Sequence, residues 1–325
     1  MFQAITMGSS TVDAFASTEV EEIIDIKTST SEEEFIAYPL GSKIVVNEMR
    51  YDVGGTGVNV GVGLARLGMK TAYLGKVGND VNGKLIMERL EKENLAFIGA
   101  RGLQSGFSII LDSHLEHDRT ILAYKGCNND LKETEVDFSK LETEWLFVAS
   151  MLGESFETMK GVVAHVKDSG GKIAFNPSST LAKKGYDFVK PIMDKTDFLS
   201  VNEEEAEMLV GAGTAEEKLR RFSMPLVVLT MGEKGLMAMD ENNIYEAKPL
   251  PNVKVCENTG AGDACTAGIL AGLILDKPIE DCLKMGMINA ESILCHYGAH
   301  NKLFNMQEME EHLSKDTREI SKRSR

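Results

Sequence analysis

The chain has 325 residues, of which 43% are hydrophobic and 26% charged, a composition typical of a globular protein with one large domain or two smaller ones. Its formal net charge of −15 argues against DNA or another polyanion as the main partner. No stretch approaches the roughly 18 apolar residues of a membrane span, and the start, MFQAITMGSS, lacks the basic and apolar regions of a secretion signal.

Five cysteines are present, but they form no CxxC pair, and only Cys295 stands next to a histidine, His296. We therefore expect neither a zinc site nor a disulfide framework. A reducing cytoplasm is the simplest setting for such a chain, so we expect a cytoplasmic protein.

The first strand is predicted at residues 2–8, and Asp13 follows it; taken alone, Asp13 is best interpreted as a turn former. Residues 14–53 are acidic and end in the strand-like SKIVVNEMRYDVG. The segment FSIILDSHLEHDRTILAY predicts a β-hairpin, with His114 and His117 as solvated residues of its turn. Neither segment fits the pattern of the remaining chain, so we assign them to a small separate sheet that could act as a lid.

The stretch GGTGVNVGVGLARLG, residues 54–68, predicts a glycine-rich turn followed by a closely packed helix that ends at Gly68. Its glycines also approximate a dinucleotide fingerprint, but the spacing is loose, and Asp80 stands in a loop rather than at the end of a second strand. Asn59 is unusual inside this helix, because asparagine is a poor helix former and needs partners when it is buried.

From residue 140 onward, short apolar runs alternate with helix-like segments: WLFVAS, KIAFN, DFLSV and PLVVLT are each followed by polar residues or glycine. One of these segments, SFETMKGVVAHVKDSGG, predicts a helix that Ser155 caps and Gly170 ends. Apolar strands separated by helices indicate a parallel sheet that is covered on both faces.

Two of these strands end in residues with two interpretations. Asn202 and Glu205 form a capping-box pattern at a helix start, and the same two residues could hold a magnesium ion through water. Thr230 ends PLVVLT and Gly232 follows it. A tight hairpin explains both residues, and so does a site in which a hydroxyl and exposed backbone lie near a phosphate.

The stretch ENTGAGDACTAG, residues 257–268, flanks the carboxylate Asp263 with small residues. A carboxylate is favoured in the first turn of a helix by the helix dipole. Small residues at a helix start also let a phosphate approach the backbone, with Asp263 as an acid or base beside it. Asp13, Asn202, Thr230 and this stretch each follow a predicted strand, and ligands of open α/β sheets bind beyond the carboxyl ends of the strands.

Two of these regions together resemble the PfkB carbohydrate kinases, which have the ribokinase-like fold. GGTGVNVGVGLARLG with the following GKVGNDVNGK is similar to the family's N-terminal signature, and ENTGAGDACTAG is similar to its C-terminal one. The resemblance implies an α/β fold, a three-layer α/β/α sandwich with a mostly parallel central sheet. We expect residues 1–13, 54–105 and 125–325 to form this catalytic core and residues 14–53 and 106–124 to form the β lid.

The resemblance also implies a role for each candidate residue. Asp263 would be the general base, and the backbone N–H groups of Gly260, Ala261 and Gly262 would form the anion hole for the transferring phosphoryl group. The remaining implied site comprises Asp13, Gly55 and Asn59 for the substrate, Asn202, Thr230, Gly232 and Asn289 for the nucleotide, and Glu205 for water-mediated Mg²⁺.

The implied activity is transfer of the γ-phosphate of ATP to a hydroxyl of a sugar or sugar-like substrate. Many relatives dimerise through the lid, so a homodimer is expected. Glu257 and His296 depart from residues that ribokinase-like members often carry, which leaves activation by a monovalent cation open. The substrate is open as well.

Three alternatives remain at this point. A nucleoside kinase would use the same fold, a dinucleotide oxidoreductase would bind NAD(P)H, and a non-catalytic module would have kept the fold alone. The chain contains no GxxxxGK[ST] sequence, which excludes the P-loop route to phosphoryl transfer.

Overall fold

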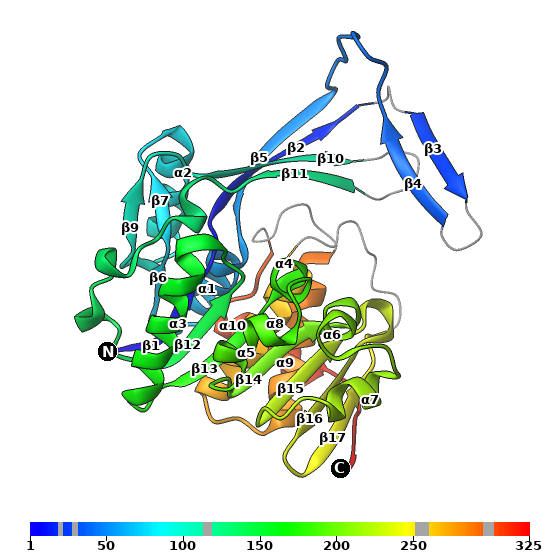
Figure 1. The fold of residues 1–325 in the computed structure, drawn as a ribbon. Coiled ribbons are helices and arrows are strands. Elements are labelled where there is room, and N and C mark those ends of the chain that lie inside the picture. The colour runs from blue at the N-terminus through cyan, green and yellow to red at the C-terminus, as the bar shows by residue number, and fades with distance from the viewer. Residues whose placement is uncertain (19–21, 28–31, 113–118, 251–259, 295–301) are drawn as a thin grey trace.

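A ten-stranded sheet forms the centre of the computed structural model, in the order β18-β17-β16-β15-β14-β13-β12-β1-β6-β8 (Figure 1). The structure describes residues 1–18, 22–27, 32–112, 119–250, 260–294 and 302–325. The strands are β1 (Phe2–Met7), β6 (Thr71–Leu74), β8 (Ala96–Phe97), β12 (Thr143–Ala149), β13 (Lys172–Asn176), β14 (Phe198–Asn202), β15 (Leu226–Thr230), β16 (Leu236–Asp240), β17 (Asn243–Ala247) and β18 (Ile320–Ser324). Neighbouring strands from β8 to β15 are parallel, and β16, β17 and β18 pair antiparallel.

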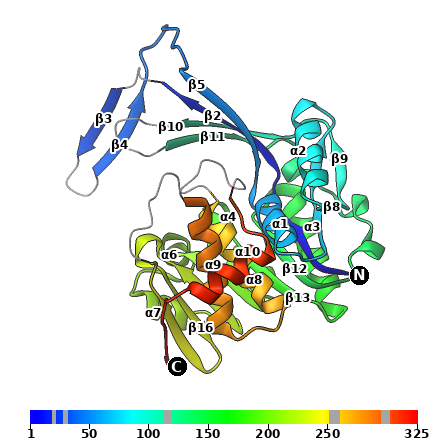
Figure 2. The same ribbon diagram turned by 180° about the vertical axis from the view of Figure 1, so that it is seen from behind.

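Helices cover both faces of this sheet, as Figures 1 and 2 show from opposite sides. One face carries α3 (Gly153–Asp168), α4 (Ser178–Ala182), α5 (Tyr186–Met193), α6 (Glu203–Val210) and α7 (Ala215–Arg220), and the other carries α1 (Thr56–Arg66), α8 (Ala261–Ile274), α9 (Ile279–Leu294) and α10 (Met306–Lys315). Further elements are α2 (Val81–Lys92), the strand pair β7 (Lys76–Gly78) and β9 (Ala100–Gly102), and the 3₁₀ turns η1 (Gly126–Asn129), η2 (Glu133–Glu135), η3 (Phe138–Lys140) and η4 (Gly232–Lys234).

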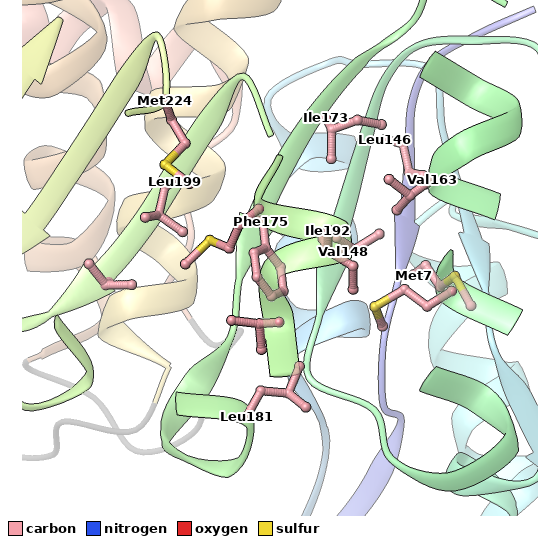
Figure 3. Packing of buried hydrophobic residues seen from close by; sticks show 14 of the residues in the cluster. Met7, Leu146, Val148, Val163, Ile173, Phe175, Leu181, Ile192, Leu199 and Met224 are labelled. Carbon is pink, nitrogen blue, oxygen red and sulfur yellow. The ribbon is translucent and has the colours of Figure 1, made fainter. Parts of the chain in front are cut away.

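Alternate residues of each central strand supply the two cores. In β12, Leu146 and Val148 pack into the cluster beneath α3 and α5, whereas Phe147 and Ala149 pack into the cluster beneath α8 and α9. Figure 3 shows the first cluster, in which Met7, Val148 and Phe175 lie among residues of the covering helices. Burial on both faces is why these strands are continuous apolar runs in the sequence, and the expected mostly parallel, helix-covered sheet is confirmed.

A second sheet has four strands in the order β11-β10-β2-β5. Its strands are β2 (Thr11–Ser17), β5 (Glu48–Gly54), β10 (Gly106–Asp112) and β11 (Arg119–Tyr124), and a separate pair is formed by β3 (Glu22–Lys27) and β4 (Glu32–Ala37). In Figures 1 and 2 this sheet leaves the core beside α1 and α2 and extends over the end of the molecule where α4 lies. The predicted hairpin is confirmed, because β10 and β11 pair antiparallel. We call the four-stranded sheet the lid.

Two local predictions are wrong. Asp13 is no turn residue: it lies inside β2 and pairs with Ser108 on one side and Asp52 on the other. Ser155 does not cap α3, because that helix already begins at Gly153, and the buried Ser155 hydroxyl accepts a hydrogen bond from Leu131 N instead. The predicted ends are confirmed, since Gly170 and Gly68 have φ of 87° and 82° just after α3 and α1.

Asp80 caps the start of α2 by accepting a hydrogen bond from Gly83 N, so a structural role accounts for this residue. Within the described residues, every helix is too short or too polar to cross a lipid bilayer.

Candidate active site

A cavity of about 160 Å³ lies at the carboxyl ends of three neighbouring parallel strands, β13, β14 and β15. Its lining residues are Thr56, Asn176, Ser178, Ser200, Val201, Asn202, Glu205, Thr230, Gly260, Gly262 and Asp263. Six of these were singled out from the sequence because they follow predicted strands or stand in the ENTGAGDACTAG stretch. The structure thus brings together residues from five separate segments around one small polar space.

The start of α8 supplies the part of this cavity that suits an anion. Gly260 stands at the N-cap with φ of 82°, a left-handed conformation that favours glycine, and no side chain among the described residues caps the helix. A Cβ on Gly262 would meet no atom of the described residues within 4 Å, so nothing in that part of the chain covers its backbone. Uncapped N–H groups and the positive end of the helix dipole make such a terminus suited to phosphate.

Asp263 lies in the first turn of α8 and is half-buried. Burial raises the pKa of its carboxyl from 3.8 to about 6, while the hydrogen bond from Asn59 acts to lower it. Asn59 Nδ2 donates to Asp263 Oδ2 at 2.7 Å, and Asn59 Oδ1 is buried without a partner among the described residues. A carboxylate with a pKa near neutrality is suited to accept a proton from a hydroxyl.

Close backbone contacts of α1 place Asn59 opposite Asp263. A Cβ on Gly57 would lie 2.8 Å from Gly8 Cα, and one on Gly63 would lie 2.6 Å from Ala267 Cβ of α8. Gly55, at the N-cap of α1, has φ of 97° and would collide with Ser9 if it carried a side chain. The glycines therefore let α1 approach both β1 and α8, which is how Asn59 reaches the first turn of α8.

Asn202 and Glu205 form the predicted capping box at the start of α6. Glu205 N donates to Asn202 Oδ1 at 2.8 Å, and Asn202 N donates to Glu205 Oε2 at 3.0 Å. Burial raises the pKa of Glu205; the hydrogen bond from Asn202 opposes this rise, and the negative charge of Asp263 adds to it. The capping interpretation is confirmed, yet Glu205 also lines the cavity, so the cap does not remove it from the candidate site.

The donor set fits magnesium better than a softer metal. Among the described residues there is no cluster of three or more histidine, cysteine, aspartate or glutamate side chains that could hold a metal ion. The cavity offers the carboxylates of Glu205 and Asp263, which are hard oxygen donors. Mg²⁺ typically keeps several waters and is bound through one or two carboxylates plus substrate phosphates, which is what this set could provide.

Asp13 lies in the lid, close to the start of α1. Thr11 Oγ1 donates to Asp13 Oδ1 at 2.9 Å, and a side chain on Gly54 would collide with the Asp13 carboxylate. Gly54 directly precedes Gly55, the N-cap of α1. Asp13 therefore approaches the glycine-rich turn that leads to Asn59, although it is not among the residues that line the cavity.

The other residues predicted to bind the nucleotide lie in different parts of the fold. Thr230 ends β15 and lines the cavity, whereas Gly232 lies in the exposed turn η4 with φ of 57°. Asn289 is 0% exposed and donates from Nδ2 to Ala264 O at 2.8 Å, which ties α9 to the first turn of α8. The hairpin that explains Thr230 and Gly232 is present, because β15 and β16 pair antiparallel.

Sequence reasoning missed five residues of the cavity: Thr56, Asn176, Ser178, Ser200 and Val201. Asn176 ends β13 just as Asn202 ends β14, so the criterion that selected Asn202 could have found it. Ser178 and Ser200 carried no signal in the sequence: Ser200 lies inside a buried strand, where its hydroxyl pairs with Thr266 at 2.9 Å. The predictions for Glu257, His296, His114 and His117 fall outside the described residues.

Comparison with known proteins identifies the family. Residues 23–304 match the family described as pfkB family carbohydrate kinase. The chain belongs to this family. It is therefore a phosphotransferase that acts on a hydroxyl group, and the expectations for the family, the fold and the class of reaction are confirmed.

Relatives within the family differ in what they phosphorylate. An uncharacterized sugar kinase of Archaeoglobus fulgidus is 29% identical over 74% of this chain and 98% of its own length. A cytidine kinase of Thermococcus kodakarensis is 26% identical over 75% of this chain and 88% of its own. Among solved structures, Arabidopsis thaliana ribokinase, complexed with ribose and ATP, has a TM-score of 0.81 and 20% identity over 96% of this chain and 98% of that one, which shows the shared fold.

Proposed function

We propose that the protein is a sugar kinase that transfers the γ-phosphate of ATP to a hydroxyl of a sugar or sugar-like substrate. The observation that carries the proposal is the pairing of Asp263, whose pKa is raised to about 6, with the uncapped start of α8 in one cavity. Phosphoryl transfer needs mainly positioning and stabilisation of charge, and this arrangement provides both beside a base.

In the proposed reaction, Asp263 accepts the proton of the acceptor hydroxyl as its oxygen bonds to the γ-phosphorus. The bond between the γ-phosphorus and the bridging oxygen breaks, and ADP leaves. The backbone N–H groups of Gly260, Ala261 and Gly262 hold the transferring phosphoryl group, because α8 begins there without a side-chain cap among the described residues. A base of this kind contributes about 10² to 10⁴ in rate.

Substrate and nucleotide would occupy opposite sides of Asp263. Asp13, Gly55 and Asn59 come from the lid and the start of α1, and we assign them to the acceptor hydroxyls; the unpartnered Asn59 Oδ1 is available for one of them. Asn202 and Thr230, which end β14 and β15, are assigned to the nucleotide phosphates. Gly232 and Asn289 are assigned to the same nucleotide, Asn289 acting from its buried position behind the first turn of α8.

Magnesium would be held by Glu205 through water, and it would neutralise charge on the phosphates of ATP. Two asparagines would position the carboxylates: Asn202 fixes Glu205 through the capping box, and Asn59 orients Asp263 through its hydrogen bond.

A nucleoside kinase is the second candidate, favoured by the relationship to the cytidine kinase of Thermococcus kodakarensis. A panel of sugars, sugar phosphates and nucleosides, each assayed for acceptor-dependent formation of ADP from ATP, separates the two. We expect a sugar to give the highest kcat/KM. Turnover with nucleosides alone would establish the second candidate, and turnover with no acceptor would contradict both.

The lid is proposed to join two copies of the chain. Successive residues of a strand point to opposite faces, so Asp13, Arg50 and Asp52 lie on one face and Ala14, Met49 and Tyr51 on the other. Across the four lid strands, charged residues occur only on the face of Asp13. On the uncharged face, Met49, Tyr51 and Leu122 are 51%, 60% and 53% exposed, which favours burial against a second lid.

We also propose that the protein is cytoplasmic. ATP is the proposed donor, and the three cysteines of the described residues, Cys127, Cys265 and Cys282, are free thiols.

A further inference from the structure

Ser178 is unusual among the residues that line the cavity. Its φ of 46° lies in the left-handed region, which costs energy for a residue with a side chain. In the described chain two other residues besides glycine share this conformation, Asn94 and Asp276, and both directly follow the last capping residue of a helix. Asparagine and aspartate tolerate such helix ends. Ser178 instead begins a helix, α4, and faces the cavity.

The conformation of Ser178 is held by contacts on both sides. Its backbone N–H donates to Asn176 Oδ1 at 2.8 Å, and its hydroxyl donates to Ser150 Oγ at 2.7 Å. Asn176 ends β13, and Ser150 directly follows β12. Two neighbouring strands of the central sheet therefore fix the turn from Asn176 to Ser179, and strained residues fixed in this way concentrate at functional sites.

The fixed turn leads directly to Glu205. The backbone of the next residue, Ser179, lies near enough to the Glu205 carboxylate to act as a donor that lowers its pKa, and Asn202 N donates to the same carboxylate at 3.0 Å. Glu205 is 7% exposed and lines the same cavity as Asn176 and Ser178. Backbone groups at the start of α6 and in the strained turn therefore both approach the Glu205 carboxylate.

We infer that Ser178 is a positioning residue, whose strained backbone holds Ser179 N–H against Glu205 and so aims the Glu205 carboxylate at the magnesium of a bound metal–nucleotide complex. This inference rests on the proposed function, which assigns Glu205 to magnesium. It adds a residue group, Asn176 to Ser179 with Ser150, that orients the carboxylate without touching the reacting atoms.

The test compares Ser178→Gly with Asn94→Gly. Glycine adopts positive φ freely, so both variants should melt at or above the wild-type temperature. Asn94 has a similar φ of 53°, is exposed and follows α2, far along the chain from the cavity, which makes it the matched control. Ser178→Gly removes the hydroxyl contact to Ser150 and frees the turn, whereas Asn94→Gly leaves the cavity unchanged.

The measurement is the affinity of a non-hydrolysable ATP analogue, titrated by calorimetry with and without Mg²⁺. In the wild type and in Asn94→Gly, Mg²⁺ should tighten binding by the same factor. In Ser178→Gly that factor should fall roughly threefold to tenfold, the value of about one hydrogen bond, with metal-free affinity unchanged. An unchanged factor in a folded Ser178→Gly would overturn the inference, as would a wild type whose affinity does not depend on Mg²⁺.

Ser150→Ala provides a second variant if Ser178→Gly does not fold, because it removes only the acceptor of the Ser178 hydroxyl. It should lower the Mg²⁺ factor in the same direction, and an unchanged factor would count against the inference. Since no turnover is measured, the outcome is separate from that of the acceptor panel. If no acceptor of the panel is phosphorylated, the proposed function is refuted. If Ser178→Gly nevertheless lowers the factor by which Mg²⁺ tightens binding of the ATP analogue, the role of Ser178 is retained.

Discussion

Asp263 and Asn59 are 204 positions apart in the sequence and form one unit in the fold. Asn59 is an unfavourable residue for the interior of a helix, and its amide finds a partner in the Asp263 carboxylate. The carboxylate in turn is raised to a pKa of about 6 by burial, with Asn59 limiting the rise. The buried amide of Asn59 and the buried carboxylate of Asp263 thus satisfy each other, and a carboxyl with this pKa is mostly ionised at neutral pH, as the proposed base must be.

Because the pKa of Asp263 is raised on folding from 3.8 to about 6, its ionisation works against the folded state. Below about pH 4 the carboxyl is protonated in both states and the cost is absent; as pH rises through 6 the cost becomes complete. We therefore expect Asp263→Asn to melt above wild type at pH 7.5 and level with it at pH 3.5. The gain is at most about 3 kcal/mol, from roughly 1.4 kcal/mol per pKa unit.

Melting curves of the two proteins across this pH range check the prediction. Asparagine can still accept from Asn59 Nδ2, so the contact to α1 is retained. A variant that is less stable than wild type at pH 7.5 would mean that Asp263 is a stabilising ion in the folded protein, contrary to the raised pKa.

Sequence reasoning selected Asp263, Asn59, Asn202 and Glu205, because each residue type was out of place locally or stood at a strand end. It could not select Ser178, whose importance comes from a backbone angle that no residue type indicates. Nor could it place Asp13 correctly. A single aspartate after a strand usually marks a turn, but here the chain continues directly into the lid strand β2.

The start of α6 carries an observed capping box and, in the proposed function, a magnesium-binding carboxylate. The capping box that Asn202 and Glu205 form satisfies two backbone donors, and glutamine at the position of Glu205 can form the same box. We therefore expect Glu205→Gln to melt within a few degrees of wild type yet to need a higher Mg²⁺ concentration for half-maximal turnover. A Mg²⁺ titration of the initial rate, paired with a melting curve, measures both quantities.

Thr214 and Glu217 form an equivalent box at the start of α7, so Glu217→Gln is a matched control for this experiment. Its magnesium requirement should equal that of the wild type. If Glu205→Gln lowers the melting temperature and leaves the metal requirement unchanged, Glu205 serves the cap alone.

The glycines of α1 and α8 differ in what a methyl group would meet. Gly57→Ala would force Cβ to 2.8 Å from Gly8 Cα, so we expect a loss of stability of about 1 to 3 kcal/mol and displacement of Asn59. Gly262→Ala meets no atom of the described residues within 4 Å, so we expect unchanged stability and weaker ATP binding. Denaturant unfolding and nucleotide titration distinguish the two; weaker stability with normal ATP binding in Gly262→Ala would contradict the anion hole.

The elements were predictable where burial imposes a pattern. The four apolar runs after residue 140 coincide with β12, β13, β14 and β15, because strands covered on both faces are apolar throughout. The sheet edge was not predictable: β18, with sequence ISKRS, is mostly exposed and joins the sheet through its pairing with β17. Its side chains therefore carry no periodic signal.

On the scale of the whole molecule, the lid is an amphipathic sheet whose charged face carries Asp13 and whose uncharged face is partly exposed. The base of the uncharged face is buried, since Val12 and Val53 pack with residues of α1 and α2. The outer part has no such cover from the described residues of its own chain. A second lid would bury this outer part and, at the same time, hold Asp13 over the start of α1.

We expect the protein to sediment as a dimer, and Leu122→Glu to convert it to a monomer without lowering the melting temperature of the core. Ala123→Glu is the matched control, because Ala123 is also exposed but points to the opposite face of β11. Sedimentation velocity of the three proteins provides the measurement. A wild type that is monomeric, or a Leu122→Glu variant that stays dimeric, would place the interface elsewhere or remove it.

The central claim is that Asp263 is the base of a phosphoryl transfer, and turnover of Asp263→Asn tests it most directly. The variant and the wild type are compared with the best acceptor of the panel, together with their affinities for Mg²⁺ and ATP. We expect kcat to fall by about 10² to 10⁴, while nucleotide affinity changes little because the backbone of Gly260 to Gly262 is intact. A variant that turns over at the wild-type rate would contradict the account.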